Sequence, residues 1–345
     1  MPQFNPRFRA TGIGTLPLAE AGEAVEIILA SLPQIPFWPQ LTARSPWEDM
    51  VLQFAPGLPG LWVDLEGRSV GLGPASDRAA ALTDFYEADL GGDLNHFSLT
   101  EEVAPGFFEL VQRVSKETDG VERLKGQVAG PVTFCLAAKD AEGRALIHDQ
   151  ELAQACARGL GLKGAWQVAN FPAKMDKPLI FIDEPALTGF GSAFMSLERE
   201  AALALLNATA GPIREAGGFV GIHVCGNTDW SMITAAEVDI VNFDAYGYGE
   251  GFLLYPKEIA AFLERGGVIA WGLVPTLEYT DQVTAEDLLG RLEEMMGRLA
   301  SQGIDRNLLA ERSLLTPTCG MGSLERPTAL AILELLTETS RRLRG

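Results

Sequence analysis

Three residues in the second half of the chain have side chains that are typical ligands of a transition-metal ion. His223 and Cys225 are two residues apart in the apolar segment VGIHVCG (220–226), and Cys319 lies in SLLTPTCGM (313–321). Because side chains alternate along a strand, His223 and Cys225 are expected to point to the same side. Two thiolates and an imidazole suit zinc, which accepts sulfur and nitrogen ligands. Three protein ligands leave a fourth coordination position open, as is typical of a catalytic zinc site.

Each of these residues alone would have an ordinary structural explanation, because histidine and free cysteine in buried strands are usually packed in the core. The combination of His-x-Cys at one strand end with Cys-Gly at another favours a metal site. The other two cysteines, Cys135 and Cys156, lack such partners, and we assign them to the core. On a metal held by the first set, an entering thiol would lose its proton far below its free pKa of about 8.5 and become a nucleophile.

The elements that position these residues alternate between short apolar runs and longer amphipathic stretches. Runs with the length and composition of strands are 61–67, 126–134, 179–187, 220–226, 238–246, 268–276 and 313–321. Helical patterns occupy 149–169, 196–218, 284–303 and the C-terminal segment. Six strand–helix units follow residue 126, which predicts a (β/α)8 TIM barrel with an N-terminal elaboration. No linker divides residues 1–345, so we expect one domain.

The first two barrel strands are less certain from the pattern than the last six. Three segments compete for the two places: TGIGTLP (11–17), IPFWPQL (35–41) and LWVDLEG (61–67). Their order of preference stays open. In any such barrel the C-terminal strand ends share one rim, where active sites are found. Asp183 and Asp244 end the runs on either side of His223, so these carboxylates are expected on the same rim.

At these residues the chain resembles the catalytic barrel of cobalamin-independent methionine synthase, and also the methylcobalamin:coenzyme M methyltransferases of the uroporphyrinogen decarboxylase-like superfamily. TGIGTLP is similar to the synthase's opening strand, GPVT (130–133) to its third-strand motif and IDEPAL (182–187) to its fourth. His-x-Cys at 223–225 and Cys-Gly at 319–320 match the metal ligands. The resemblance implies a zinc-dependent methyltransferase that moves a methyl group to a thiol, most simply homocysteine.

The same resemblance implies roles for individual residues. Zinc would be bound by His223, Cys225 and Cys319, and Asp244 falls where the synthase has a glutamate ligand. The substrate amino group would pair with Asp183, and Glu66 would supply a second carboxylate, with Asp64 nearly as plausible. The substrate carboxylate would be held by backbone N–H groups around Ile13, Gly14 and Thr15. Asp183 and Asp244 are the expected catalytic carboxylates.

One departure from the synthase concerns the methyl donor. The folate-using synthase has a histidine after its seventh strand that helps to protonate the leaving group, whereas WGLVPTLEYTD (271–281) contains none. A methyl group on a folate nitrogen leaves poorly without an acid, but a methyl-corrinoid needs no proton. We therefore expect a methyl-corrinoid protein as a possible donor partner, with methyltetrahydrofolate as the alternative. Glu278 or Asp281 could replace the missing acid.

Three other functions remain open at this stage. The acceptor could be another thiol such as coenzyme M, although a sulfonate would be repelled by Asp183. A uroporphyrinogen decarboxylase-like lyase would use arginines, for which Arg44 and Arg68 are available, but would give no reason for the metal ligands. A non-catalytic zinc-holding subunit of a corrinoid complex would bind metal without responding to a thiol.

Composition narrows the possible partners and the location. The net charge of −19 argues against a nucleic-acid partner. No stretch approaches the roughly 18–20 apolar residues of a membrane helix, and the N-terminal residues do not resemble an export signal. Four scattered cysteines do not form a disulfide framework, and a reducing cytoplasm fits them better.

Overall fold

The centre of the molecule is a parallel sheet whose strands follow one another in sequence order. The computed structural model describes residues 4–116, 119–192 and 195–345. Six strands are paired in the order β3 to β8, each parallel to the next. Their bounds are β3 Lys125–Ala129, β4 Leu179–Asp183, β5 Phe219–Val224, β6 Ile240–Asp244, β7 Val268–Val274 and β8 Ser313–Pro317. Almost every residue in them is buried, as expected for a sheet covered by helices.

Two extended N-terminal segments link the edge strands of this sheet, in the order of an eight-stranded barrel. Parallel bridges join Ala10 to Leu315 in β8, Thr15 to Gln40, and Phe37 to Lys125 in β3. TGIGTLP and IPFWPQL therefore occupy the first two barrel places, which the sequence pattern alone could not assign. The (β/α)8 TIM-barrel prediction is confirmed at the level of the fold.

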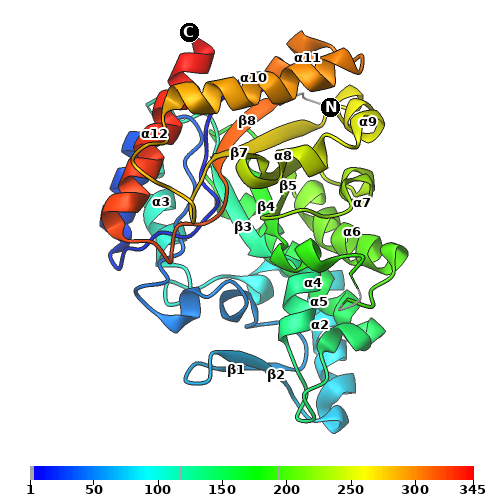
Figure 1. Cartoon of the computed structure of the whole chain (residues 1–345). Coiled ribbons are helices and arrows are strands. Elements are labelled where there is room, and N and C mark those ends of the chain that lie inside the picture. Colours follow the sequence, from blue (N-terminus) through cyan, green and yellow to red (C-terminus); the bar gives the residue numbers. More distant parts are fainter. Residues whose placement is uncertain (1–3, 117–118, 193–194) are drawn as a thin grey trace.

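The third competing segment, LWVDLEG, lies outside the barrel. It forms β1 (Leu61–Asp64), which pairs antiparallel with β2 (Ser69–Leu72). This hairpin and helix α2 (Arg78–Leu90) lie together at the end of the molecule away from α10 and α11, at the bottom of Figure 1. They constitute the predicted N-terminal elaboration.

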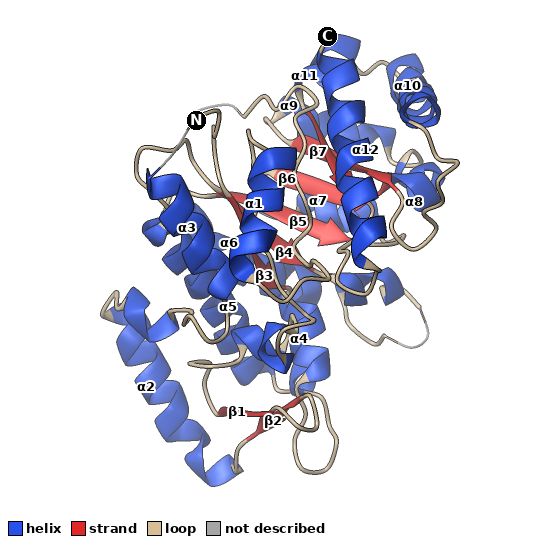
Figure 2. Cartoon of the chain, turned by 90° about the vertical axis from the view of Figure 1, so that its left-hand side faces the viewer, coloured by secondary structure: helices blue, strands red, loops and turns tan. Residues whose placement is uncertain are grey.

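Helices surround the sheet, as Figure 2 shows from the side. Their bounds are α1 Ala21–Ser31, α3 Pro105–Lys116, α4 Pro131–Ala137, α5 Gln150–Asn170, α6 Arg199–Glu215, α7 Trp230–Ala235, α8 Ala245–Phe252, α9 Pro256–Glu264, α10 Ala285–Ser301, α11 Arg306–Glu311 and α12 Arg326–Arg344. The helix predicted over 284–303 is present as α10, and Thr284 and Asp287 form a capping box at its start. The 196–218 pattern begins later than predicted, with Glu198 as N-cap of α6.

The run 126–134, predicted as one strand, is a strand followed by a helix. β3 ends at Ala129, and α4 starts at Pro131, a residue that suits the first turn of a helix. The Glu184 carboxylate accepts hydrogen bonds from the backbone N–H groups of Val132 at 2.7 Å and Thr133 at 3.0 Å. The IDEPAL segment at the end of β4 thus contacts the GPVT segment after β3, and the Glu184 carboxylate stabilises the first turn of α4.

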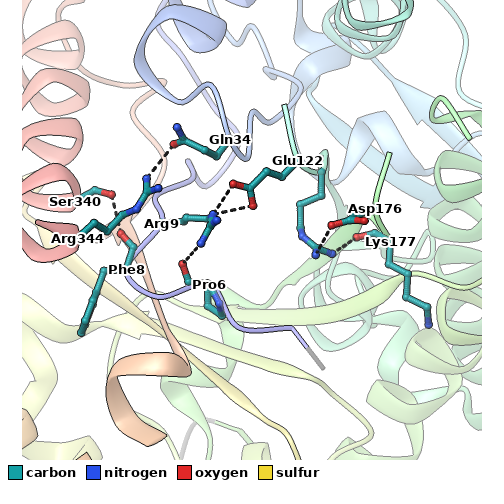
Figure 3. Close-up of polar contacts among 10 residues, drawn as sticks. Pro6, Phe8, Arg9, Gln34, Glu122, Asp176, Lys177, Ser340 and Arg344 are labelled. Atoms are coloured by element: carbon teal, nitrogen blue, oxygen red, sulfur yellow. Dashed lines mark hydrogen bonds and ion pairs between the residues drawn. The ribbon is translucent and has the colours of Figure 1, made fainter. Parts of the chain in front are cut away.

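At the other end of the barrel, residues 6–9 contact Glu122, which precedes β3, and Ser340 in α12 (Figure 3). Arg9 donates to the Glu122 carboxylate at 2.8 Å and to the Pro6 carbonyl at 3.0 Å. Ser340 in α12 donates to the Phe8 carbonyl at 2.6 Å. These bonds help to hold residues 6–9 in place, and backbone bonds of Phe8 with Ser313 and of Thr11 with Leu315 set the register of the segment against β8. Among the described residues, no helix has the length and apolar character needed to cross a membrane.

Candidate metal centre and substrate cavity

The three predicted metal ligands come together at the C-terminal rim of the barrel. His223 lies in β5, Cys225 follows the last residue of that strand, and Cys319 lies two residues beyond β8. Their ligand atoms all lie within 4.8 Å of one another. Among the residues that the structure describes, this is the one group of three or more His, Cys, Asp or Glu side chains close enough to hold a metal ion. The residue types are those that zinc prefers.

The orientation and tautomer of His223 follow from its contact with Asn242 in β6. The Asn242 Nδ2 group donates to the Ala270 carbonyl and to Thr316 Oγ1, both at 2.8 Å. A backbone carbonyl can only accept, so Asn242 Oδ1 must face His223, where it lies 2.5 Å from Nδ1. Nδ1 therefore carries the proton, and the lone pair lies on Nε2. That atom is buried and makes no oriented hydrogen bond within the described chain.

This arrangement is how proteins prepare a histidine for a metal. A metal-bound imidazole usually donates its second N–H to a neighbouring oxygen, which fixes the ring and raises its basicity. A buried polar atom without a partner is costly, and an ion coordinated by Nε2 would satisfy it. The residues present therefore fit a metal ion on the evidence of their own geometry.

The two sulfur atoms interact with each other and with the imidazole. Hydrogen bonding from the Cys319 thiol, together with the proximity of the His223 imidazole, lowers the pKa of Cys225 far below its usual range. The same Cys225–Cys319 contact raises the pKa of Cys319. Burial lowers the pKa of His223, but its contact with Cys225 and the charge of Asp183 outweigh burial and raise it. The two sulfurs and the imidazole thus lie close enough to bind one ion together.

A cavity of about 470 Å³ opens directly beside the three ligands. Its lining includes Ile13, Gly14, Thr15, Gln40, Thr42, Met50, Asp183, Pro185, His223, Cys225, Cys319, Gly320, Gly322 and Ser323. The predicted residues of the first barrel segment, the end of β4 and the metal-ligand group are therefore brought together around one space.

Asp183 presents an unpaired carboxylate oxygen in this region. It is paired in register with His223 on the neighbouring strand, and its Oδ1 is buried without a hydrogen-bond partner among the described residues. Burial raises the pKa of Asp183 to about 6, opposed by the charges of Lys125 and His223. A carboxylate in this state would gain from a cationic group in the cavity.

The carbonyl groups of Ile13, Gly14 and Thr15 accept hydrogen bonds, whereas the described chain offers no acceptor to the amides of Gly14 and Thr15. The Ile13 carbonyl accepts from Lys125 Nζ at 2.6 Å. The Gly14 carbonyl accepts from the Gln40 N–H at 2.9 Å, and the Thr15 carbonyl from the Met321 N–H at 3.0 Å. Within the described chain, no acceptor is found for the N–H groups of Gly14 and Thr15. These two amides are therefore available to an acceptor in the cavity.

Three predicted site residues are not brought into this group: Glu66, its alternative Asp64, and Asp244. Glu66 lies exposed in the turn between β1 and β2 and does not line the cavity, and Asp64 accepts hydrogen bonds within the same turn. The prediction missed this because LWVDLEG was considered a possible barrel strand, whereas it forms the outer hairpin.

Asp244 ends β6, as predicted, but its carboxylate accepts from the Gly247 N–H at 2.7 Å and caps α8. It is neither in the metal-ligand group nor in the cavity lining. Burial raises the pKa of Asp244, opposed by the bond from Gly247, and the nearby charge of Glu278 raises it further. The structure therefore assigns Asp244 a capping role beside the site.

Sequence reasoning missed Gln40, whose side-chain amide has a fixed orientation. Its Nε2 donates to Gln53 Oε1 at 2.8 Å, and Gln53 in turn donates to the Val103 carbonyl. Gln40 Oε1 is therefore directed toward Gly14, where even a Cβ atom would lie 2.8 Å from it. The cavity thus contains a neutral acceptor contributed by the second barrel segment.

Solved structures share this fold over the whole chain. A B12-independent methionine synthase from Shewanella sp. W3-18-1, solved in complex with selenomethionine, is 16% identical, with a TM-score of 0.64 and 98% of each chain covered. A methyltransferase from Methanosarcina mazei is 12% identical, with a TM-score of 0.58 over 100% of this chain and 96% of that one. No protein-family model matches the sequence, and no curated protein matches it.

Fold and geometry together define a class of protein. The chain is a TIM barrel with the fold of these methyltransferases, and it has a candidate metal centre next to a cavity at the C-terminal rim.

Proposed function

We propose that this protein is a zinc-dependent methyltransferase that transfers a methyl group to the sulfur of homocysteine. One observation carries the proposal: His223, Cys225 and Cys319, far apart in sequence, have ligand atoms within 4.8 Å of one another beside a cavity. The fold shared with a methionine synthase and a second methyltransferase supports it. Zinc held by these three residues would lower the pKa of an entering thiol and hold its sulfur as a nucleophile.

The remaining residues of the cavity match an α-amino acid. The free oxygen of Asp183 is available to the substrate ammonium group, and such charge-assisted hydrogen bonds are strong. Gln40 Oε1 offers that group a second acceptor in place of the carboxylate expected from Glu66. The free amides of Gly14 and Thr15 are available to the substrate carboxylate. Homocysteine has all three groups that this arrangement would bind.

The transfer step requires a donor whose leaving group departs readily. A bond forms between the substrate sulfur and the methyl carbon, the bond from that carbon to the donor breaks, and the thiol proton passes to solvent. His96 and His148 lie in short helices and are not lining residues, so His223 is the one histidine among the described residues that line the cavity. A methyl-corrinoid donor, whose corrinoid leaves with the bonding electrons and needs no proton, therefore suits this chain better than methyltetrahydrofolate.

Two alternatives are less compatible with the geometry. A sulfonate-bearing thiol such as coenzyme M would lack an ammonium group for Asp183. For a decarboxylase, arginines should line the cavity, but Arg44 donates to Glu48 at 3.1 Å and Arg68 lies exposed in the outer hairpin turn. The residues that line the described cavity include no arginine.

A methyl-transfer assay tests the proposal directly. Purified protein loaded with zinc is incubated with homocysteine and either methylcobalamin or methyltetrahydrofolate, and methionine is measured. We expect methionine from methylcobalamin and none from the Cys319→Ser variant. Methionine formed only from the folate would refute the donor, and no methionine from either donor would refute the proposed reaction.

A further inference from the structure

A lysine that none of these roles uses is buried inside the barrel. Lys125, the first residue of β3, is fully buried. Its ammonium group donates to the Ile13 carbonyl at 2.6 Å and has a longer contact of 3.4 Å with Gln127 Oε1. It also lies 4.6 Å from the centroid of the Phe181 ring. A charged group in such surroundings is costly, so its retention calls for a role.

The positive charge of Lys125 is favoured by the carboxylate of Asp183, which lines the substrate cavity. Burial lowers the pKa of Lys125 to about 8, and the carboxylate of Asp183 opposes that shift. The charge of Asp183 therefore favours the protonated form of the Lys125 amine. Because the Asp183 carboxylate lines the cavity, the charge of Lys125 interacts with a residue of the substrate site.

The contact with Ile13 determines where the next amide points. In a trans peptide the C=O and the following N–H point in opposite directions, and the described chain has no cis peptide. Lys125 lies at the N-terminal start of β3, whereas Gly14 lines the cavity at the other end of the barrel. The Gly14 N–H therefore points away from the Lys125 ammonium group, and Gly14 itself lines the cavity.

We propose that Lys125 is a positioning residue that aims and polarises the Gly14 amide, and so gives the site its preference for substrates that have a carboxylate. This inference rests on the proposed function. The Lys125 ammonium group donates to the Ile13 carbonyl. Because hydrogen bonds in series polarise one another, this bond makes the Gly14 N–H of the same peptide group a stronger donor. The carbonyls of Gly14 and Thr15 are already held by backbone amides, so Lys125 completes the fixation of the segment.

Two thiols separate this role from a purely structural one. Homocysteine has the carboxylate, and 3-mercaptopropylamine is the same molecule without it. The ratio of their dissociation constants measures what the carboxylate contributes. A general loosening of the barrel would weaken both thiols alike and leave the ratio unchanged, whereas loss of Gly14 positioning would weaken homocysteine selectively.

The experiment measures thiol binding without a methyl donor. Cobalt(II) is substituted at the metal site, and each thiol is titrated while the sulfur-to-cobalt charge-transfer absorption is followed. The variant is Lys125→Met, which keeps the length of the side chain. The matched control is Lys163→Met, which removes another fully buried lysine, in α5 and outside the cavity.

We expect wild type and Lys163→Met to bind homocysteine at least tenfold more tightly than 3-mercaptopropylamine. Lys125→Met should lose most of that preference while its affinity for 3-mercaptopropylamine changes less than twofold. An unchanged preference in Lys125→Met would overturn the inference and leave the proposed function standing. Failure of wild type to bind homocysteine through its sulfur would instead refute the proposed function, and the inference with it.

If Lys125→Met does not fold, Lys125→Gln carries the test, because it keeps a hydrogen-bond donor and loses the charge. A reduced preference for homocysteine in that variant supports the role of the charge. A preference equal to that of wild type overturns it.

Discussion

Replacing Asn242 with leucine should weaken metal binding although Asn242 is not a metal ligand. The side chains have similar volumes, so packing changes little, but the acceptor for the His223 Nδ1–H is lost along with the two bonds donated by Nδ2. Partners of this kind contribute roughly 10–100-fold to metal affinity, which corresponds to about 1.4–2.7 kcal/mol. His223 would then lose both its fixed ring orientation and its fixed tautomer.

The same substitution should lower the stability of the protein without metal. Three hydrogen bonds at about 1 kcal/mol each suggest a loss of about 3 kcal/mol in the free energy of unfolding. Zinc affinity is measured by competition with a chromophoric chelator at a temperature where circular dichroism shows the variant folded. The control Thr316→Val removes one acceptor of Asn242 Nδ2 but leaves the contact with His223. We expect Thr316→Val to bind zinc within about threefold of wild type, well short of the 10–100-fold loss given above.

The reasoning would be refuted by a specific pattern of affinities. If Asn242→Leu binds zinc as tightly as wild type while His223→Ala does not bind it, the imidazole needs no partner at Nδ1. If Thr316→Val and Asn242→Leu lose the same affinity, the loss reflects general damage to the strand ends.

Three further substitutions test other parts of the account. Asp183→Asn should weaken homocysteine binding roughly tenfold or more, since charge-assisted hydrogen bonds contribute about 1.5–3 kcal/mol. The binding of 4-mercaptobutyrate, which lacks the amino group, should be nearly unaffected. Equal losses of affinity for both thiols would remove the assignment of Asp183 to the amino group. Glu184→Ala should reduce the free energy of unfolding by about 2–5 kcal/mol, because the N–H groups of Val132 and Thr133 lose their acceptor. Thermal or denaturant unfolding of the variant and of wild type measures this loss of stability. Glu66→Gln, in the exposed hairpin turn, should change thiol affinity by less than about twofold, as is usual for surface substitutions; a larger effect would return Glu66 to the site.

The last six barrel strands and the ligand group were predictable because both have strong local signals. Apolar runs of strand length mark β3 to β8, and ligand-type residues stand at the ends of two of them. Since all C-terminal strand ends of a barrel share one rim, His223 and Cys319 could be placed together although they are nearly a hundred residues apart.

The first two barrel segments could not be assigned because they make isolated bridges instead of regular strands. IPFWPQL contains two prolines, which lack the N–H that a ladder requires. LWVDLEG has a more strand-like composition and does form a strand, but in the outer hairpin. The misplacement of Glu66 followed from that competition.

Residues that act through others were also missed. Asn242 and Lys125 each stand within or beside an apolar run, and a polar residue in such a place is a signal that a buried hydrogen bond or charge must be satisfied. Their partners are distant in sequence: Asn242 contacts Ala270 and Thr316, and Lys125 contacts Ile13. Only the folded arrangement identifies those contacts.

The central claim is that His223, Cys225 and Cys319 hold one zinc ion whose open position receives a thiol. X-ray absorption at the zinc edge, recorded with and without homocysteine, tests it most directly. We expect stoichiometric zinc with two sulfur neighbours in the free protein and three after homocysteine is added. Protein without zinc, or zinc whose sulfur neighbours do not change on adding homocysteine, would contradict the account.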